Sequence, residues 1–226
     1  MNRINRVKLS DSSTWQPFIH ALKVALQAEP LGISAQKEMA PLPDVSQRFD
    51  RESAKKAKQS AVMILLYPEE GRIKFPLIVR PQYPGVHSGQ VALPGGKYED
   101  DDQDLIFTAL RETEEEVGIQ KEQVEVIGQL SELYVPPSNF NILPVIGVIP
   151  SAPQFVIEEN EVEELVIADI TVLNDETKRK QKQMSFYSGL KVDVPYFDVQ
   201  EKVVWGATAM ILSEFAAIIN TINTKK

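Results

Sequence analysis

The stretch from Leu93 to Ile119, LPGGKYEDDDQDLIFTALRETEEEVGI, most constrains the fold of this chain. It predicts a strand end, a double-glycine turn, an acidic loop and an amphipathic helix. Asp102 or Asp104 suits the N-cap of that helix, and Gly118 suits its C′ position, where a positive φ costs glycine little. Small and apolar side chains recur with helical spacing and are expected to face a core: Ile106, Ala109, Leu110, Thr113 and Val117.

A second face of this helix carries Glu112, Glu115 and Glu116, because residues three and four apart are neighbours on a helix. Unpaired carboxylates at this spacing repel one another by roughly a few tenths of a kcal/mol per pair. Mg²⁺ and Mn²⁺ prefer carboxylate oxygens and water as ligands. The pattern therefore predicts a divalent metal site on this face.

Composition excludes several kinds of function. The chain has 226 residues, 43% of them hydrophobic, which predicts a soluble globular protein with a sizeable core. Its net charge of −8 argues against a general binder of nucleic acid or anionic membrane, which needs a basic face. Because the chain has no cysteine, disulfides, thiolate metal sites and cysteine nucleophiles are excluded.

The same features predict a cytoplasmic protein. The segment MNRINRVKLSDSSTW lacks the apolar core of a signal peptide. No apolar run reaches the roughly 18 residues that a membrane-spanning helix needs. The absence of cysteine fits a reducing compartment.

An N-terminal helical extension and linker, residues 1–58, is expected to precede a main domain of residues 59–224. Ser12 or Ser13 is placed to cap a helix that ends near Pro30. We expect this helix to pack on the main domain or on a second copy of the chain. Its apolar face carries Trp15, Phe18, Ile19, Leu22 and Leu26.

The linker has two parts. Residues 33–48 are interrupted by two prolines, Pro41 and Pro43, and are predicted to be irregular. Residues 51–58, RESAKKAK, predict a short charged linker or a helical turn.

The main domain is rich in predicted strands. AVMILLYPEE and FPLIVRPQ form a hairpin whose turn is Glu70-Gly71. Further strand-like runs follow Gly118, and a helix is predicted from Ala207 to Ile222. The expected fold is α+β, one mixed β-sheet sandwiched between helices.

The motif Arg111-Glu112-x-x-Glu115-Glu116-x-Gly118-Ile119, preceded by Gly95-Gly96, resembles the Nudix box. That pattern reads Gly, five residues, Glu, seven residues, Arg-Glu, an aliphatic, any residue, Glu-Glu, any residue, Gly, aliphatic. The chain departs from it in its loop and at one helical position. Arg111 lies fifteen positions after Gly96, one more than in the pattern. The first glutamate of the pattern therefore corresponds to Asp102 when positions are counted forward from Gly96, or to Gln103 when they are counted back from Arg111. Thr113 stands where an aliphatic is usual.

The longer loop and the flanking segments resemble the coenzyme A pyrophosphatase branch of that family. LIVRPQYPGVHSGQVALPGGK is similar to the upstream segment of the branch, with Leu93 in place of the usual Phe. VVWGATAMIL and AQKEMAP are similar to its closing and leading segments, so the resemblance covers residues 33–220. Gly85 stands where the branch signature has a second arginine.

The resemblance implies a Nudix fold and metal-assisted attack of water on a pyrophosphate, with Mg²⁺ or Mn²⁺ as cofactor. It implies that Glu112, Glu115 and Glu116 are metal ligands, joined by a backbone carbonyl of Gly95 or Gly96. Arg111 is then expected to orient the glutamates by ion pairing.

The general base is either a glutamate of the box or one from a later loop. The later candidates are Glu161, Glu163 and Glu164 in ENEVEEL, which resembles the EVxE motif of the branch. Of these three, Glu161 or Glu164 is favoured. His87 matches the HxGQ segment of the branch and is expected to contact substrate or to be structural, whereas His20 lies in the N-terminal helix.

Substrate contacts are predicted for the cations nearest the motif. Arg80 and Lys97 are expected to offset the charge of the substrate's phosphates. Tyr134, Tyr83 or Phe140 is a candidate to stack on an adenine ring.

Three functions remain open at this point. The first is a coenzyme A or acyl-CoA diphosphatase that releases 3′,5′-ADP and a 4′-phosphopantetheine. The second is a diphosphatase acting on ADP-ribose, NADH or another nucleoside diphosphate derivative. The third is a nucleotide-binding regulator without catalysis, against which the intact glutamate cluster argues. A homodimer is an open alternative for the assembly.

Overall fold

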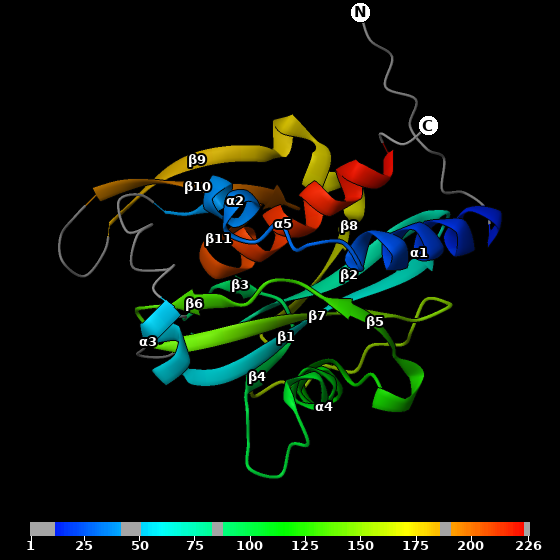
Figure 1. Cartoon of the computed structure of the whole chain (residues 1–226), viewed down its shortest axis with the longest axis horizontal. Helices are drawn as coiled ribbons and strands as arrows, with labels where there is room; N and C mark the ends of the chain where they lie inside the picture. The colour runs from blue at the N-terminus through cyan, green and yellow to red at the C-terminus, as the bar shows by residue number, and fades with distance from the viewer. Residues whose placement is uncertain (1–11, 42–50, 83–87, 186–190, 224–226) are drawn as a thin grey trace, which may run out of the picture.

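Two β-sheets carry the fold of this computed structural model, which describes residues 12–41, 51–82, 88–185 and 191–223 (Figure 1). The larger, eight-stranded sheet has the order β3-β2-β1-β7-β5, with β4 on β1, β6 on β7 and β8 on β2. Its strands are β1 (Lys58–Glu69), β2 (Arg72–Val79), β3 (Val91–Ala92), β4 (Gly95–Lys97), β5 (Glu125–Gln129), β6 (Leu133–Val135), β7 (Phe140–Val148) and β8 (Glu164–Asp169).

Helices cover both faces of the large sheet. Figure 1 shows α4 on one side and α1 and α5 on the other. The α-helices are α1 (Ser12–Leu26), α2 (Ile33–Gln36), α3 (Arg51–Lys56), α4 (Leu105–Val117) and α5 (Gly206–Asn223). Short 3₁₀ turns are η1 (Lys37–Met39), η3 (Lys121–Gln123), η4 (Ile170–Asn174) and η5 (Glu176–Lys178). The predicted α+β class, a mixed sheet between helices, is confirmed.

Strand β1 explains why two layers of helices are needed. It pairs parallel with β7 and antiparallel with β2 and β4, so it is central in the sheet. Successive side chains of a strand point to opposite faces. Ile64 and Leu66 therefore enter the core under α1 and α5, whereas Met63 and Leu65 enter the core under α4.

The hairpin turn between β1 and β2 forms as predicted. Glu70 and Gly71 both have positive φ, 49° and 72°, which a two-residue type I′ turn requires. Glu69 pairs with Arg72 across the turn.

A second sheet was not predicted. It is antiparallel, has three strands in the order β11-β10-β9, and lies beyond α5 from the large sheet (Figure 1). Its strands are β9 (Arg179–Ser185), β10 (Lys191–Val199) and β11 (Lys202–Trp205). These runs read as strands in the sequence, but their pairing is set by contacts that a single sequence does not display.

The N-terminal segment joins the main core. Trp15 and Leu22 of α1 are buried in the same cluster as α5, so the predicted packing on the main domain is confirmed. The buried carboxylate of Glu214 in α5 accepts hydrogen bonds from Gly32 N (2.8 Å) and Gln36 Nε2 (2.9 Å). The division at residue 58 stays a prediction.

One linker prediction was wrong in part. Residues 33–39, expected to be irregular, form α2 and η1, because the first proline after Gly32 is Pro41 and Glu214 holds the start of the turn. Residues 42–48 of that segment lie outside the described residues. Of the alternatives for residues 51–58, the helical turn is confirmed as α3. Within the described part of the chain, the helices lack either the length or the apolar character to span a bilayer.

Candidate metal and pyrophosphate site

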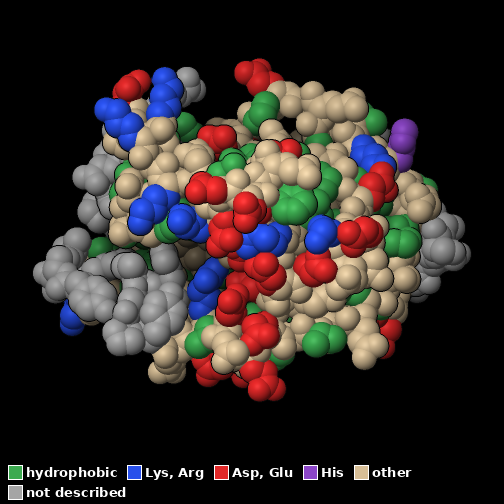
Figure 2. Space-filling view, turned by 90° about the horizontal axis from the view of Figure 1, so that it is seen from below, with side chains coloured by type: hydrophobic (Ala, Val, Ile, Leu, Met, Phe, Trp, Pro, Cys, Tyr) green, Lys and Arg blue, Asp and Glu red, His purple; other side chains and the backbone are tan. Residues whose placement is uncertain are grey.

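The site is built on α4, which is capped at both ends. Asp104 Oδ1 accepts a hydrogen bond from Phe107 N (2.8 Å), so Asp104 rather than Asp102 is the N-cap. Gly118 adopts the left-handed conformation, φ 73°, and its N–H donates to Glu114 O (2.9 Å), as predicted for C′. Figure 2, seen from the side of α4, shows acidic side chains gathered over this helix and the loop before it, with a few basic ones among them.

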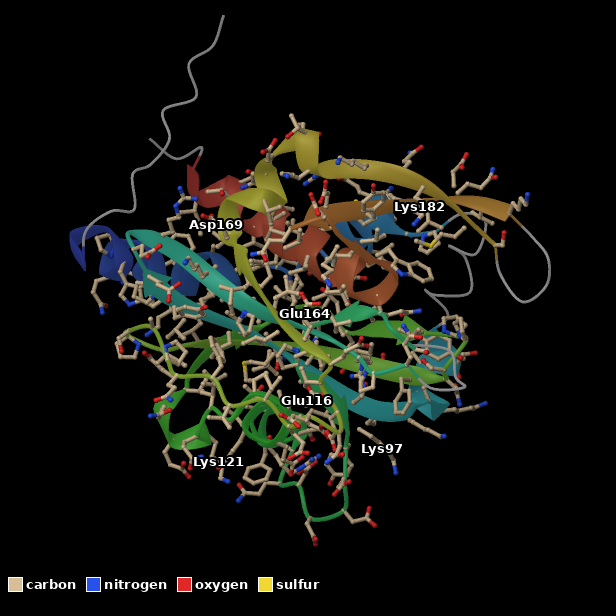
Figure 3. The ribbon with its side chains drawn as sticks, turned by 180° about the vertical axis from the view of Figure 1, so that it is seen from behind. Lys97, Glu116, Lys121, Glu164, Asp169 and Lys182 are labelled. Carbon is tan, nitrogen blue, oxygen red and sulfur yellow. The ribbon has the colours of Figure 1, made fainter. Side chains whose placement is uncertain are left out.

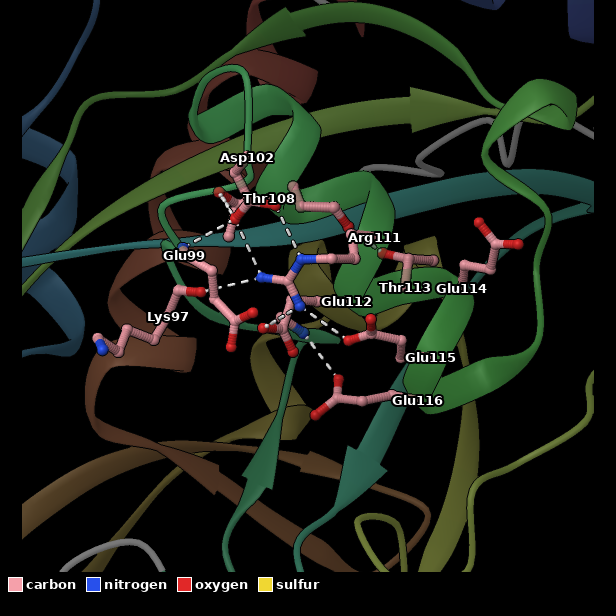
Figure 4. A network of polar contacts seen from close by, with 12 residues as sticks. Lys97, Glu99, Asp102, Thr108, Arg111, Glu112, Thr113, Glu114, Glu115 and Glu116 are labelled. Carbon is pink, nitrogen blue, oxygen red and sulfur yellow. Dashed lines mark hydrogen bonds and ion pairs between the residues drawn. The ribbon is translucent and has the colours of Figure 1, made fainter.

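Asp102 has a different task, which is to anchor Arg111 (Figure 4). Its side chain is 1% exposed and accepts from Arg111 Nε (2.8 Å) and Nη2 (3.0 Å) in a bidentate pair. Thr108 Oγ1 (2.8 Å) and Glu99 N (3.0 Å) donate to Oδ2 as well. The Arg111 hydrogen bonds hold the pKa of Asp102 down at about 2. Asp102 and Gln103 are the two positions that correspond to the first glutamate of the motif, depending on the direction of counting. Asp102 pairs with Arg111, whereas Gln103 is exposed.

Arg111 connects this anchor to the glutamates. Its Nη1 donates to Glu112 Oε1 (3.0 Å) and to Glu115 Oε2 (2.8 Å), and its Nη2 donates to Lys97 O (3.0 Å). One guanidinium, fixed from behind by Asp102, therefore sets the positions of two carboxylates. This geometry supports the orienting role predicted for Arg111.

The double glycine is required by close approach. A Cβ on Gly95, whose φ is 150°, would lie 2.3 Å from Ala61 O. A Cβ on Gly96 would lie 2.3 Å from the carboxyl carbon of Glu112. Glycine at both positions therefore lets β4 run between β1 and the glutamate face of α4.

Glu116 is the most deeply buried of the three glutamates. Its side chain is 3% exposed; Oε2 accepts from Gly95 N (2.8 Å), and Oε1 lies 3.9 Å from Arg80 Nη2. Burial raises the pKa of Glu116 to about 8, against the opposing effects of Arg80 and the Gly95 N–H. Arg80 Nη2 also donates to Gly95 O (3.0 Å).

The structure separates the two candidates for a later-loop base. Burial raises the pKa of Glu112, and the negative charge of Glu161 adds to the rise for both Glu112 and Glu116, so Glu161 lies near the cluster. Glu164 lies at the start of β8 (Figure 3) and instead forms an ion pair with Lys202 of the small sheet.

The loop that carries Glu161 is fastened to the end of α4. Val156 N donates to Val117 O (3.0 Å), and Glu158 N donates to Glu116 O (3.1 Å). Gly118 leaves room for this loop, since a Cβ there would lie 2.7 Å from Val156 O. No local sequence signal predicts these two hydrogen bonds, because the positive φ of Gly118 is by itself a sufficient reason for glycine at this position.

Other predicted contacts are less closely tied to the cluster. The exposed side chain of Lys97 points away from the glutamates in Figure 4, although its carbonyl holds Arg111. Tyr134 and Phe140 lie at the β6–β7 turn, where Tyr134 bonds to Asn139 and Lys58 stands over Phe140. His87 and Tyr83 lie outside the described residues, and His20 is exposed on α1.

The donor chemistry of the cluster fits a hard divalent cation. Glu112, Glu115 and Glu116 offer oxygen ligands, and their mutual repulsion is a cost that a cation removes. Among residues 12–41, 51–82, 88–185 and 191–223, no three acidic or histidine side chains already stand in a ligating arrangement. Arg111 holds Glu112 and Glu115, and the Gly95 N–H holds Glu116, so a cation would compete with these bonds.

Comparison with known proteins agrees with this geometry. A family model described as NUDIX domain matches residues 57–185. "Nudix hydrolase 15, mitochondrial" of Arabidopsis thaliana is 34% identical over 194 residues, 82% of this chain and 65% of that protein. "Nudix hydrolase 22, chloroplastic" of the same plant is 30% identical over 224 residues, 96% of this chain and 70% of that protein. The chain thus spans about two thirds of the length of these relatives.

A solved structure shows the same fold. RenU, a Nudix hydrolase from M. smegmatis, superposes with a TM-score of 0.52 at 17% sequence identity. The match covers 74% of this chain and 88% of RenU.

Proposed function

Because the chain belongs to the Nudix family, we propose that it hydrolyses the pyrophosphate bond of a nucleoside diphosphate derivative. The observation that carries this proposal is the glutamate face of α4, held against Gly95-Gly96 by the Asp102–Arg111 anchor. A protein that only binds a nucleotide has little need for three converging carboxylates.

Glu112, Glu115 and Glu116 are proposed to hold the metal, with the Gly96 carbonyl as a further ligand. Mg²⁺ or Mn²⁺, when bound, neutralises phosphate charge and lowers the pKa of a bound water. Arg111 fixes the orientation of Glu112 and Glu115 from behind, so these side chains lose little rotamer freedom on binding.

Residues around the cluster are proposed to neutralise the charge of the substrate and to remove a proton from the attacking water. Arg80 forms an ion pair with Glu116 through Nη2. Its side chain is 31% exposed, and the remaining nitrogens of its guanidinium are proposed to bind a phosphate. Glu161 is proposed as the general base in preference to Glu164, because it lies beside the cluster and is free of the Lys202 ion pair. Lys97 and His87 stay proposed substrate contacts.

The substrate is proposed to be coenzyme A or an acyl-CoA, cleaved to 3′,5′-ADP and an (acyl-)4′-phosphopantetheine. This proposal rests on the similarity of the HSGQVALPGG segment and the lengthened loop to the coenzyme A pyrophosphatase branch. Within this loop, Asp102 pairs with Arg111 and Asp104 caps α4.

A substrate panel tests the proposal. The protein is incubated with Mg²⁺ or Mn²⁺ and with CoA, an acyl-CoA, ADP-ribose, NADH or a diadenosine polyphosphate, and the products are separated by chromatography. We expect the highest kcat/KM with CoA or acyl-CoA. A preference for ADP-ribose or NADH would establish the alternative diphosphatase, and no turnover of any substrate would favour the nucleotide-binding regulator.

Composition supports the remaining proposals, which are a cytoplasmic location and no nucleic-acid or membrane partner. A homodimer stays an open alternative.

A further inference from the structure

The loop between β7 and β8 carries the proposed general base, and backbone hydrogen bonds fix this part of the loop at both ends. At one end, Glu158 N donates to Glu116 O of α4 (3.1 Å). At the other end, Glu163 N donates to Val79 O, the last residue of β2 (2.9 Å). The segment between these two bonds therefore joins the helix of the glutamate cluster to the strand that ends just before Arg80.

Within this segment the chain makes a tight turn that starts at Glu158. The carbonyl oxygen of Glu158 accepts hydrogen bonds from Glu161 N and Val162 N, both at 2.9 Å. Val162, which directly follows Glu161, is 1% exposed and lies in the core under α4. Glu161 itself is exposed. The backbone of Glu161 is thus held in place while its side chain is accessible to water.

The side chain of Glu158 closes the same turn. Its Oε1 accepts hydrogen bonds from Asn160 Nδ2 (2.6 Å) and from Asn160 N (3.3 Å). Hydrogen bonds to an ionised carboxylate are shorter and stronger than those between neutral groups. Because Asn160 directly precedes Glu161, this contact restricts the backbone next to the proposed base. The N–H, the carbonyl and the carboxylate of Glu158 therefore all act to shape the turn and to fasten it to α4.

Glu158 also relates the proposed base to the glutamate cluster. It bridges the backbones of Glu116 and Glu161 through its N–H and its carbonyl. Burial raises the pKa of Glu116 to about 8, and the negative charge of Glu161 adds to this rise, which agrees with their proximity. A general base has to lie within about 3 Å of the proton that it removes, or to reach it through one water. A misplacement of about 1 Å can lower a rate about a hundredfold, so the shape of this turn matters to catalysis.

We propose that Glu158 and Asn160 are positioning residues for the general base Glu161. The Asn160 amide donates to the Glu158 carboxylate, and the turn that results keeps the Glu161 carboxylate at a fixed distance from the cluster on α4. In this role neither residue touches the metal or the substrate. The inference rests on the proposed function and extends it, because it assigns a role to two residues outside the glutamate helix.

Alanine variants test the proposal through kcat. Glu158→Ala and Asn160→Ala each remove the side-chain hydrogen bond and are expected to lower kcat about tenfold. KM for the substrate and the affinity for Mn²⁺, measured by calorimetry, should not change, because the metal ligands and the substrate contacts are retained. The double variant should lose no more than either single variant, since both remove the same interaction.

Glu158→Gln separates positioning from direct chemistry. Glutamine keeps an oxygen that accepts a hydrogen bond from Asn160, but it has no charge with which to ligate a cation or remove a proton. We expect Glu158→Gln to retain most of the wild-type kcat. Glu159→Ala is the matched control and should retain it fully. Glu159 is an exposed acid of the same turn, and its side chain makes no hydrogen bond within the part of the chain that the structure describes.

Amide hydrogen exchange reports on the turn without turnover of substrate. The amides of Glu161 and Val162 should exchange about tenfold faster in Glu158→Ala and Asn160→Ala than in wild type, because the turn that holds them loses its side-chain hydrogen bond. Their exchange rates should be unchanged in Glu158→Gln and Glu159→Ala. Mass spectrometry of the peptide that contains residues 156–163 measures these rates.

Two results would overturn the inference. One is wild-type kcat in Glu158→Ala. The other is an equal loss of kcat in Glu158→Ala and Glu158→Gln, which would assign the effect to the charge of Glu158. Failure of the proposed function is a separate outcome. A fully active Glu161→Gln, or no turnover by the wild type, would remove the base itself, whereas the exchange rates would still show whether Glu158 and Asn160 hold the turn.

Discussion

Substitution Asp102→Asn removes the charge that anchors Arg111 and leaves the shape of the side chain almost unchanged. The carboxylate is 1% exposed, so solvent screens its pairing little. Folding lowers the pKa of Asp102 from 3.8 to about 2, which corresponds to roughly 2.5 kcal/mol of stabilisation at pH 7. We therefore expect Asp102→Asn to lower the free energy of unfolding at pH 7 by roughly 2 to 4 kcal/mol.

The sign of the pH dependence follows from the lowered pKa. A carboxyl whose pKa is depressed by folding stabilises the folded state above its unfolded pKa, 3.8, and loses that contribution as the pH falls towards 2. The difference between wild type and Asp102→Asn should thus be constant from about pH 5 to 8 and shrink below about pH 4. Urea unfolding followed by circular dichroism at pH 7, 5 and 3.5 measures it.

Gln103→Ala is the matched control for this substitution. Gln103 is the neighbouring position that the motif count leaves open, but its side chain is exposed. The control should change stability by less than about 0.5 kcal/mol. Equal costs for the two variants, or a cost for Asp102→Asn that persists undiminished at pH 3.5, would refute the assignment of Asp102 as the anchor.

Three further predictions concern the cluster itself. Burial raises the pKa of Glu116 from 4.5 to about 8, so the metal-free protein should lose stability as the pH rises through that window. Glu116→Gln should remove this loss, which is on the order of 4 kcal/mol at pH 8, as thermal unfolding in EDTA would show; an unchanged pH profile would contradict it. Gly96→Ala should abolish most activity, because its Cβ would overlap the Glu112 carboxylate, and full activity with an intact fold would show that β4 can move away. Glu161→Gln should lower kcat by about 10² or more, while Glu164→Gln should affect kcat less; the reverse order would assign the base to Glu164.

Local signals made the glutamate helix and the β1–β2 hairpin predictable. The helix has an aspartate cap, a 3.6-residue apolar period and a terminal glycine, and each of these acts within one or two turns of the chain. The hairpin depends on a turn of two residues with positive φ, which Gly71 adopts at little cost. The glutamate face follows from helical spacing, and so does the pairing of Arg111 with Glu115 four positions later.

Contacts between distant segments explain what the sequence left open. Asp102 is predictable from the sequence as a candidate N-cap and as a position of the motif, but its pairing with Arg111 depends on how the acidic loop folds back. The helical turn at residues 33–36 depends on Glu214, 178 positions away. The choice between Glu161 and Glu164 as the base depends on Lys202, which forms an ion pair with Glu164. Lys202 belongs to the small sheet, whose strand pairing no local sequence pattern specifies.

Glu115 offers the most direct test of the central claim that the glutamate helix of this chain hydrolyses a pyrophosphate with a metal ion. Its side chain is 51% exposed, so Glu115→Gln should leave the folded state intact, which the melting temperature checks. The decisive measurement is release of 3′,5′-ADP and 4′-phosphopantetheine from CoA by wild type and Glu115→Gln, with Mg²⁺ or Mn²⁺ and with EDTA. We predict equal amounts of both products only when a cation is present, and a loss in kcat of about 10³-fold, or ~4 kcal/mol, in the variant. Turnover in EDTA, or a variant as active as the wild type, would contradict the account.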